Sequence, residues 1–244
     1  MSTIIKICGI KDVATAEFIR DAGADMIGLV FTDSPRKIDT LTASSIVRSL
    51  GEPLRKKILE VPPPMLRATD DQWYMRSHQI LESYLQHKRP LTVGIFAKES
   101  IDEINEIIEK TDIDLVQLAG NYKIEDSLSI TRQTLFALGV NHATSKKDIL
   151  KQITPGHVLS IIFDSFNNKN IGGSGISFDW NDFFNIDLDM PYMLAGGLNV
   201  HNIESAIKKL NPWGVDVSSG VEEKGCKSKA LIEEFIKIVR RTNA

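Results

Sequence analysis

Short apolar runs alternate with amphipathic stretches along almost the whole chain, and this alternation constrains the fold more than any other feature. The apolar runs are rich in Val, Ile and Leu, as strands buried on both faces are, and the stretches between them place apolar residues at helical spacing. The expected strands lie at residues 4–8, 26–31, 92–96, 115–118, 134–138, 158–163, 192–195 and 214–217. Eight strand–helix units are the number that closes a parallel barrel, so the sequence predicts a (β/α)8 fold in one domain of residues 1–244.

The helices between these strands begin and end at recognisable residues. Asp12 is placed to cap the first helix and Gly23 to stop it, and Asn199 is placed to cap the helix that follows the seventh strand. The expected helices lie at residues 13–22, 42–50, 101–108, 124–130, 147–153, 203–210 and 229–240, with a further short helix near residues 179–180. A doubly wound open sheet is the alternative, but it usually has fewer strands. The chain also has neither a G-x-G-x-x-G motif after its first strand nor a Walker loop, which removes the main support for a dinucleotide or nucleoside triphosphate site.

Residues 51–90 interrupt the alternation between the second helix and the third strand. Three prolines at 62–64 cannot lie inside a helix, but Asp70 and Asp71 then open a segment with helical spacing. Its shared apolar face carries Trp73, Ser77, Ile80, Leu81 and Tyr84. An insertion between a helix and the next strand lies at the amino-terminal face of a barrel, so we expect an accessory packing element there. As a helix it could also mediate self-association, and both a monomer and a homodimer remain open.

Composition and charge limit the possible partners and compartments. The chain is 42% hydrophobic and 25% charged, with a net charge of −3 and no long basic run, so we expect no nucleic-acid partner. It has no stretch near the ~20 apolar residues of a membrane span. Met1 leads directly into a strand-like run, so no signal peptide is expected. The two cysteines form neither a disulfide framework nor a metal-ligand spacing, which favours a cytoplasmic protein without a metal.

Small-residue loops follow the last two expected strands. Gly196 and Gly197 come after the seventh strand, and Ser218, Ser219 and Gly220 come after the eighth. Because both loops emerge at the carboxyl end of adjacent parallel strands, their backbone N–H groups can converge on one anion. Loops in this position often bind phosphate in (β/α)8 barrels. The sequence therefore predicts a phosphate site here. A further glycine-rich loop with Gly173 at its centre follows the sixth strand.

Several side chains at strand ends could carry chemistry in the barrel mouth. Cys8 ends the first strand and could act as a base or nucleophile, and Asp164 ends the sixth, where partial burial would raise its pKa and make it a proton donor. Arg36 follows the second strand and could bind a substrate carboxylate through two hydrogen bonds. Gln117 and Asp216 are further candidates for substrate binding. The five histidines form no cluster in the sequence, and we expect them to be solvated.

The motifs around these residues occur in an order that resembles one family, the phosphoribosylanthranilate isomerases of tryptophan biosynthesis. The resemblance covers the chain except residues 51–90. It rests on the segments Lys6–Ile10, Ser34–Arg36, Val116–Leu118, Phe163–Ser165, Gly172–Gly175 with Phe178–Trp180, Leu194–Leu198, and Asp216–Glu222. Taken singly each motif is weak, but seven in order with sensible spacing are specific.

This resemblance implies an Amadori rearrangement of a small-molecule substrate, phosphoribosylanthranilate, without cofactor or metal. It implies that Asp164 is the general acid, Cys8 the general base and Arg36 the group that holds the anthranilate carboxylate. The amides of Gly197 and of Ser219 and Gly220 would then hold the phosphate.

Two departures from the family pattern concern the anthranilate side of the site. In the segment Gln117-Leu118-Ala119-Gly120-Asn121, Ala119 stands where the family usually has His, and Asn121 where it has an acidic residue. Residues 136–137 also lack a Lys that is common on the fifth strand. Two alternatives therefore remain: a non-catalytic sugar-phosphate-binding module, and a related aminoaldose-phosphate isomerase. The latter usually has Asp at the position of Cys8.

Overall fold

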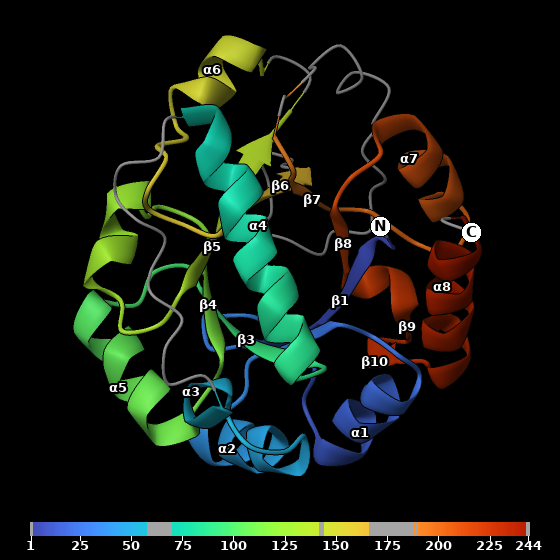
Figure 1. Cartoon of the computed structure of the whole chain (residues 1–244). Helices are drawn as coiled ribbons and strands as arrows, with labels where there is room; N and C mark the ends of the chain where they lie inside the picture. Colours follow the sequence, from blue (N-terminus) through green and yellow to red (C-terminus); the bar gives the residue numbers. More distant parts are fainter. Residues whose placement is uncertain (1, 58–69, 142–143, 166–187, 189, 243–244) are drawn as a thin grey trace.

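The computed structural model describes residues 2–57, 70–141, 144–165, 188 and 190–242. Eight strands form a closed parallel barrel in chain order, which confirms the predicted (β/α)8 fold (Figure 1). The strands are β1 (Ile4–Cys8), β2 (Met26–Val30), β3 (Leu91–Phe96), β4 (Leu115–Leu118), β5 (Thr134–Val140), β6 (Ser160–Ser165), β7 (Met193–Ala195) and β8 (Gly214–Val217). A small antiparallel pair, β9 (Glu222–Glu223) and β10 (Cys226–Lys227), follows β8.

Helices connect the strands on the outside of the barrel. They are α1 (Val13–Asp21), α2 (Thr40–Ser49), α3 (Leu54–Lys57), α4 (Asp70–His87), α5 (Ile101–Thr111), α6 (Lys146–Leu150), α7 (Ile203–Leu210) and α8 (Lys229–Thr242), with the 3₁₀ turns η1 (Ile124–Ser129) and η3 (Ser219–Val221). Asp12 caps α1 through the N–H of Thr15, as expected. None of the helices in the described ranges has the length and apolar content to cross a membrane.

Two connections differ from the sequence prediction. The α-helix expected at residues 124–130 is the 3₁₀ turn η1, in which the Ser127 hydroxyl donates to the carbonyl oxygens of Ile124 and His157. A serine hydroxyl that donates to backbone carbonyl oxygens competes with the backbone hydrogen bonds of a regular α-helix, which explains the short 3₁₀ turn. The helix α7 begins at Ile203 after Asn202, not after Asn199, whose side chain instead accepts from the N–H of His201 and opens the preceding turn.

Inward-pointing residues of the strands form the interior of the barrel, while their neighbours pack against the helices. The layer at the amino-terminal ends is apolar and consists of Ile4, Met26, Leu91, Val93, Leu115, Leu135, Leu159, Ile162 and Met193. All of these side chains are buried. The polar interior residues described below lie nearer the carboxyl ends of the strands.

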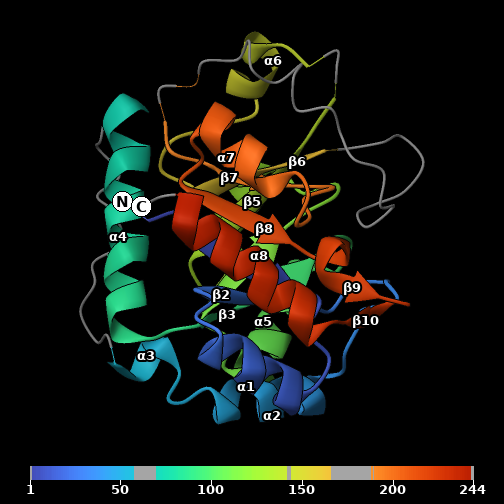
Figure 2. The same ribbon diagram turned by 90° about the vertical axis from the view of Figure 1, so that its right-hand side faces the viewer.

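Helix α4 of the insertion covers the amino-terminal end of this interior. Leu81, Tyr84 and Leu85 are buried and complete the apolar layer of the barrel floor. The indole N–H of Trp73 donates to the carbonyl of Val158, just before β6, at 3.1 Å. Figure 1 shows α4 crossing the barrel, and Figure 2 shows it at the end opposite the β9–β10 pair. The predicted position of the insertion is therefore confirmed, and the carboxyl ends of the strands remain as the place for a site.

His78 of α4 is an exception to the expectation that the histidines are solvated. Its side chain is 3% exposed, and its Nδ1 lies 2.7 Å from the carbonyl oxygen of Tyr74 and its Nε2 3.1 Å from the hydroxyl of Ser160. The rings of His78 and Trp213 pack edge to face. Burial lowers the pKa of His78 to about 4, so the ring is neutral at pH 7 and belongs to the packing beneath the barrel.

Candidate active site

Cys8 ends β1 on the strand face that points into the barrel. Neighbouring β2 contributes Gly28 directly opposite, and a Cβ on this glycine would lie 2.8 Å from the Cys8 sulfur. Gly28 thus makes room for the thiol. Burial raises the pKa of Cys8 above its ordinary value, although the nearby cations Lys6, Lys227 and Arg36 act in the opposite direction. The thiol is therefore mostly protonated in the free protein at neutral pH.

A carboxyl group and an ion pair share the interior with Cys8. Asp164 on β6 is partly buried, and burial, together with the charge of Asp216, raises its pKa to about 6. Asp216 on β8 points inward and accepts a hydrogen bond from Lys6 Nζ of β1 at 2.6 Å. The Lys6 side chain is fully buried, and its ammonium interacts with Cys8 and Asp164 as well as Asp216. Burial alone would lower the pKa of Lys6, but these acidic neighbours outweigh it and raise that pKa, so Lys6 is charged.

Lys6 was not among the residues expected from the sequence to form the site. The signal is present in the alternation of β1, because Ile4, Lys6 and Cys8 share one strand face. A lysine in the middle of an apolar strand is rarely fully buried unless it is paired. The partner, Asp216, lies 210 residues further along the chain, and only closure of the barrel between β1 and β8 makes the pair visible.

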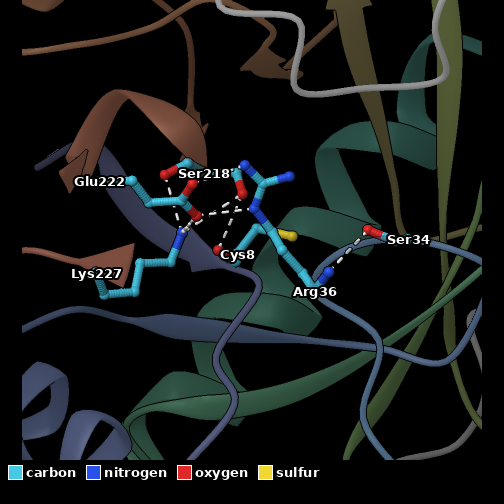
Figure 3. Close-up of polar contacts among 6 residues, drawn as sticks. All are labelled: Cys8, Ser34, Arg36, Ser218, Glu222 and Lys227. Carbon is cyan, nitrogen blue, oxygen red and sulfur yellow. Dashed lines mark hydrogen bonds and ion pairs between the residues drawn. The ribbon is translucent and has the colours of Figure 1, made fainter. Parts of the chain in front are cut away.

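Arg36 lies over the mouth but is already bound to a carboxylate of the chain itself. Its Nε and Nη2 donate to the two oxygens of Glu222 on β9, at 2.8 and 2.7 Å (Figure 3). Lys227 on β10 donates to the same carboxylate at 2.6 Å and to the backbone carbonyl of Ser218 at 2.9 Å. Gly9 makes this possible, since a Cβ there would lie 2.4 Å from Arg36 Cδ. Neither Glu222 nor Lys227 was expected as a site residue.

The two small-residue loops lie against each other, as a shared anion site requires. A Cβ on Gly220 would lie 1.8 Å from the carbonyl oxygen of Leu198, so only glycine allows this approach. Gly196 and Gly197 both have positive φ, 84° and 65°, and the Gly197 carbonyl is turned back to accept from Asn202 at 2.9 Å. Within the described residues, the backbone N–H groups of Gly197, Ser219 and Gly220 donate to no acceptor of the protein.

The remaining expected residues differ in what they contact. Gln117 on β4 is 7% exposed, and among the described residues its Oε1 has no hydrogen-bond partner, as is also true of Asp216 Oδ1. The Ser218 hydroxyl donates to the carbonyl of Cys8 at 3.1 Å, which ties the β8 loop to β1. Gly173 lies outside the described residues, as does the short helix expected near residues 179–180.

The residues of the mouth that the structure describes form an acid–base arrangement and no grouping of metal ligands. No set of three His, Cys, Asp or Glu side chains comes together in the described part of the chain as a metal centre would need. A carboxyl group with a pKa near neutrality and a thiol surrounded by cations are groups that exchange protons. Buried acceptors and free loop amides beside them can bind a polar, anionic molecule.

A closed parallel barrel with its polar groups at the carboxyl ends of the strands defines a (β/α)8-barrel enzyme. Residues 56–238 match the family model described as N-(5'phosphoribosyl)anthranilate (PRA) isomerase. The chain belongs to this family and is an isomerase.

Individual relatives cover nearly the whole chain. The N-(5'-phosphoribosyl)anthranilate isomerase of Wickerhamomyces anomalus is 36% identical over 96% of this chain and 98% of its own length. The crystal structure of phosphoribosyl anthranilate isomerase from Thermotoga maritima has a TM-score of 0.72 and 29% identity, covering 98% of this chain and 99% of its own. A phosphoribosyl anthranilate isomerase in complex with reduced 1-(o-carboxyphenylamino)-1-deoxyribulose 5-phosphate has a TM-score of 0.67 and 27% identity over the same shares.

Proposed function

We propose that this chain converts N-(5'-phosphoribosyl)anthranilate into 1-(2-carboxyphenylamino)-1-deoxyribulose 5-phosphate, the isomerisation step of tryptophan biosynthesis. The observation that carries the proposal is that Asp164, whose pKa is about 6, and Cys8 both interact with the one buried ammonium of Lys6. An Amadori rearrangement needs one proton donor and one proton acceptor and no change in the overall composition of the molecule. The mouth supplies both groups.

In the first step Asp164 acts as the general acid. Its carboxyl proton passes to the ring oxygen of the ribose as the bond between that oxygen and C1 breaks. The nitrogen lone pair forms the C1–N double bond, so the product is an open-chain protonated imine. The raised pKa of Asp164 supports this role, because an ordinary aspartate would hold no proton to give near neutral pH.

In the second step the Cys8 thiolate removes the proton from C2, and the electron pair moves through C1 to the nitrogen. The resulting enolamine, an enol at C2, tautomerises to the ketone. The buried ammonium of Lys6, with Arg36 and Lys227, favours the thiolate over the thiol. This stabilisation is needed because burial alone keeps the thiol protonated.

Groups around the mouth match the rest of the substrate. The adjoining loops of Gly197 and of Ser219 and Gly220 would take the phosphate on their free amides, and Arg36 would take the anthranilate carboxylate. The unpartnered oxygens of Gln117 and Asp216 can each accept a hydrogen bond from a sugar hydroxyl or from the substrate nitrogen. The ligand of the related complex carries a phosphate, sugar hydroxyls and an ortho carboxylate, which suits this division.

The decisive experiment follows the fluorescence of freshly prepared phosphoribosylanthranilate with the purified protein, and identifies the product by mass spectrometry and by borohydride reduction. We expect turnover by the wild type and not by Cys8→Ala. Tight binding without turnover would favour a sugar-phosphate-binding module instead. Turnover of a histidine-pathway aminoaldose phosphate, with none of the anthranilate compound, would favour the related isomerase.

A further inference from the structure

We propose that Glu222 is a positioning residue for carboxylate recognition. It holds one edge of the Arg36 guanidinium so that the adjacent edge faces the substrate, and Lys227 supplies the charge that keeps the cluster cationic. This inference rests on the proposed function and adds to it two residues of the β9–β10 pair.

The geometry of the guanidinium sets which edge is open. Arginine has two edges that can each bind a carboxylate with two parallel hydrogen bonds. Glu222 occupies the edge formed by Nε and Nη2 with both of its oxygens. Within the described residues Nη1 of Arg36 has no hydrogen-bond partner, so the edge formed by Nη1 and the second hydrogen of Nη2 remains for a second carboxylate.

The burial of the three side chains argues for a fixed arrangement and against a loose surface contact. The side chains of Arg36, Glu222 and Lys227 are 18%, 8% and 7% exposed. Paired, partly buried charges of this kind hold an arginine in one orientation, whereas an exposed pair would not. Lys227 and Glu222 lie opposite each other in the β9–β10 ladder, and Lys227 also donates to the Ser218 carbonyl. These contacts join the cluster to the end of β8.

The charge count explains the need for Lys227. An isolated Arg36–Glu222 pair sums to zero, and an incoming carboxylate would be repelled by Glu222 nearly as much as it is attracted by Arg36. With Lys227 the cluster contains two cations and one anion, so its net charge is +1. The cluster therefore attracts an anion even though its arginine is already paired.

A competing model makes Glu222 a placeholder that Arg36 leaves when substrate binds. The two models predict opposite results for Glu222→Gln. If Glu222 positions Arg36, weakening the two hydrogen bonds that fix the guanidinium outweighs the loss of repulsion, and binding of the carboxylate ligand weakens. If Glu222 is a placeholder, the uncharged side chain competes less and binding becomes tighter.

The test measures binding of two stable ligands by calorimetry: reduced 1-(o-carboxyphenylamino)-1-deoxyribulose 5-phosphate and its counterpart without the carboxylate. For Glu222→Gln we expect Kd for the carboxylate ligand to rise about 10-fold, the effect typical of losing one charged hydrogen-bond arrangement, with an unchanged Kd for the counterpart. Lys227→Met should act in the same direction and Lys227→Arg should stay near wild type. This matched pair decides the question if Glu222→Gln does not fold.

Tighter or unchanged binding of the carboxylate ligand by Glu222→Gln, or equal binding by Lys227→Met and Lys227→Arg, overturns the inference. Loss of affinity for both ligands in parallel also overturns it, because a general disturbance of the mouth would have that effect. Failure of the proposed function has a different signature, since the wild type would then bind neither ligand. If the wild type binds both equally, Arg36 does not recognise the carboxylate.

Discussion

The two ends of the barrel both bury charged groups, but they treat them differently. At the amino-terminal end each oxygen of Asp114 is occupied. Oδ1 accepts from the N–H of Leu54 at 2.7 Å, and Oδ2 accepts from Lys88 at 2.8 Å and from the N–H and hydroxyl of Thr92 at 2.8 and 2.7 Å. These bonds connect α3, the end of α4, β3 and the start of β4. The Asp114 carboxylate therefore stabilises the packing of these elements.

Asp25, which directly precedes β2, is another buried carboxylate whose two oxygens are both hydrogen-bonded. Its carboxylate is fully buried and accepts from the N–H of Ile5, from Arg89 just after α4, and from Arg240 of α8. It ties the first strand, the insertion and the last helix together at the floor of the barrel.

At the carboxyl-terminal end the polar groups are left incomplete. Asp216 has one paired and one unpaired oxygen, and Gln117 Oε1 is buried and unpaired among the described residues. Burial raises the pKa values of Cys8 and Asp164, and the nearby cations offset this effect only in part. Buried polar groups are normally satisfied, and the hydroxyl of Tyr74 on α4 is also unpaired among the described residues. What distinguishes the mouth is that its unpaired oxygens lie on the same strand ends as a thiol and a carboxyl with raised pKa values. Asp114 and Asp25 therefore hold the fold, whereas the groups of the mouth are those that we propose to bind and convert the substrate.

The largest expected effect is on catalysis at the incomplete end. We expect Cys8→Ala and Asp164→Asn each to lower kcat by about 10²–10⁴-fold, because each removes one general acid or base. The melting temperature should change little, since neither side chain makes a hydrogen bond or a close ion pair with another described residue. Steady-state kinetics and thermal denaturation of the same preparations check both parts. Wild-type turnover by Cys8→Ala would refute its assignment as the base.

The converse effect is expected at the amino-terminal end. Asp114→Ala leaves the buried ammonium of Lys88 without its carboxylate and should lower the free energy of unfolding by about 3–5 kcal/mol. Activity per folded molecule should stay close to that of the wild type. Urea denaturation measures the first and active-site titration the second. Glu106→Ala, which removes an exposed pair with Lys110 on α5, is the matched control and should change stability little.

A smaller effect is expected where the two small-residue loops meet. Gly220→Ala places a Cβ on the Leu198 carbonyl and must move one loop away from the other, so kcat/KM should fall by about 10²-fold, the effect of an ångström-scale displacement. Inhibition by inorganic phosphate should weaken in parallel. Gly51→Ala controls for a general loss of stability, because its φ of +100° strains an added side chain while nothing lies within 4 Å of the Cβ, so it should lower stability without weakening phosphate inhibition. Unchanged phosphate inhibition in Gly220→Ala would remove these loops from the phosphate site.

The pH profile should show the smallest effect, about tenfold per pH unit outside a plateau. The proposed mechanism needs protonated Asp164 and ionised Cys8, the reverse of their dominant forms at neutral pH. Below pH 6 Asp164 is protonated and kcat/KM rises with the thiolate fraction. Above pH 6, the loss of protonated Asp164 cancels the gain in thiolate until the raised pKa of Cys8 is passed.

The acidic limb near pH 6 therefore reports Asp164. Asp216→Asn removes a charge that raises this pKa and should shift the limb to lower pH. Substrate ionisation stays the same in both proteins, so the difference between their profiles isolates the enzyme group. If the acidic limb is at the same pH in both proteins, it does not report the ionisation of Asp164.

Much of this molecule follows from local sequence patterns. Strands with period two and helices with period 3.6 differ in short windows, so the eight βα units and the helical insertion around Trp73 could be predicted. Residues such as Cys8 and Asp164 could be proposed as site residues because parallel strands all end on one side of the barrel. These are properties of the chain read a few residues at a time.

Other features depend on which distant segments the barrel brings together. Lys6 meets Asp216 across 210 residues and Arg36 meets Glu222 across 186, and neither pairing has a local signal. His78 is neutral because α4 lies against β6 and the loop before β8, and not because of its neighbours in the chain. The sequence by itself determined the elements and the end at which chemistry is placed. Only the closed barrel decided the partners, because burial, charge pairing and the resulting pKa values depend on distances between strands that are remote in the chain.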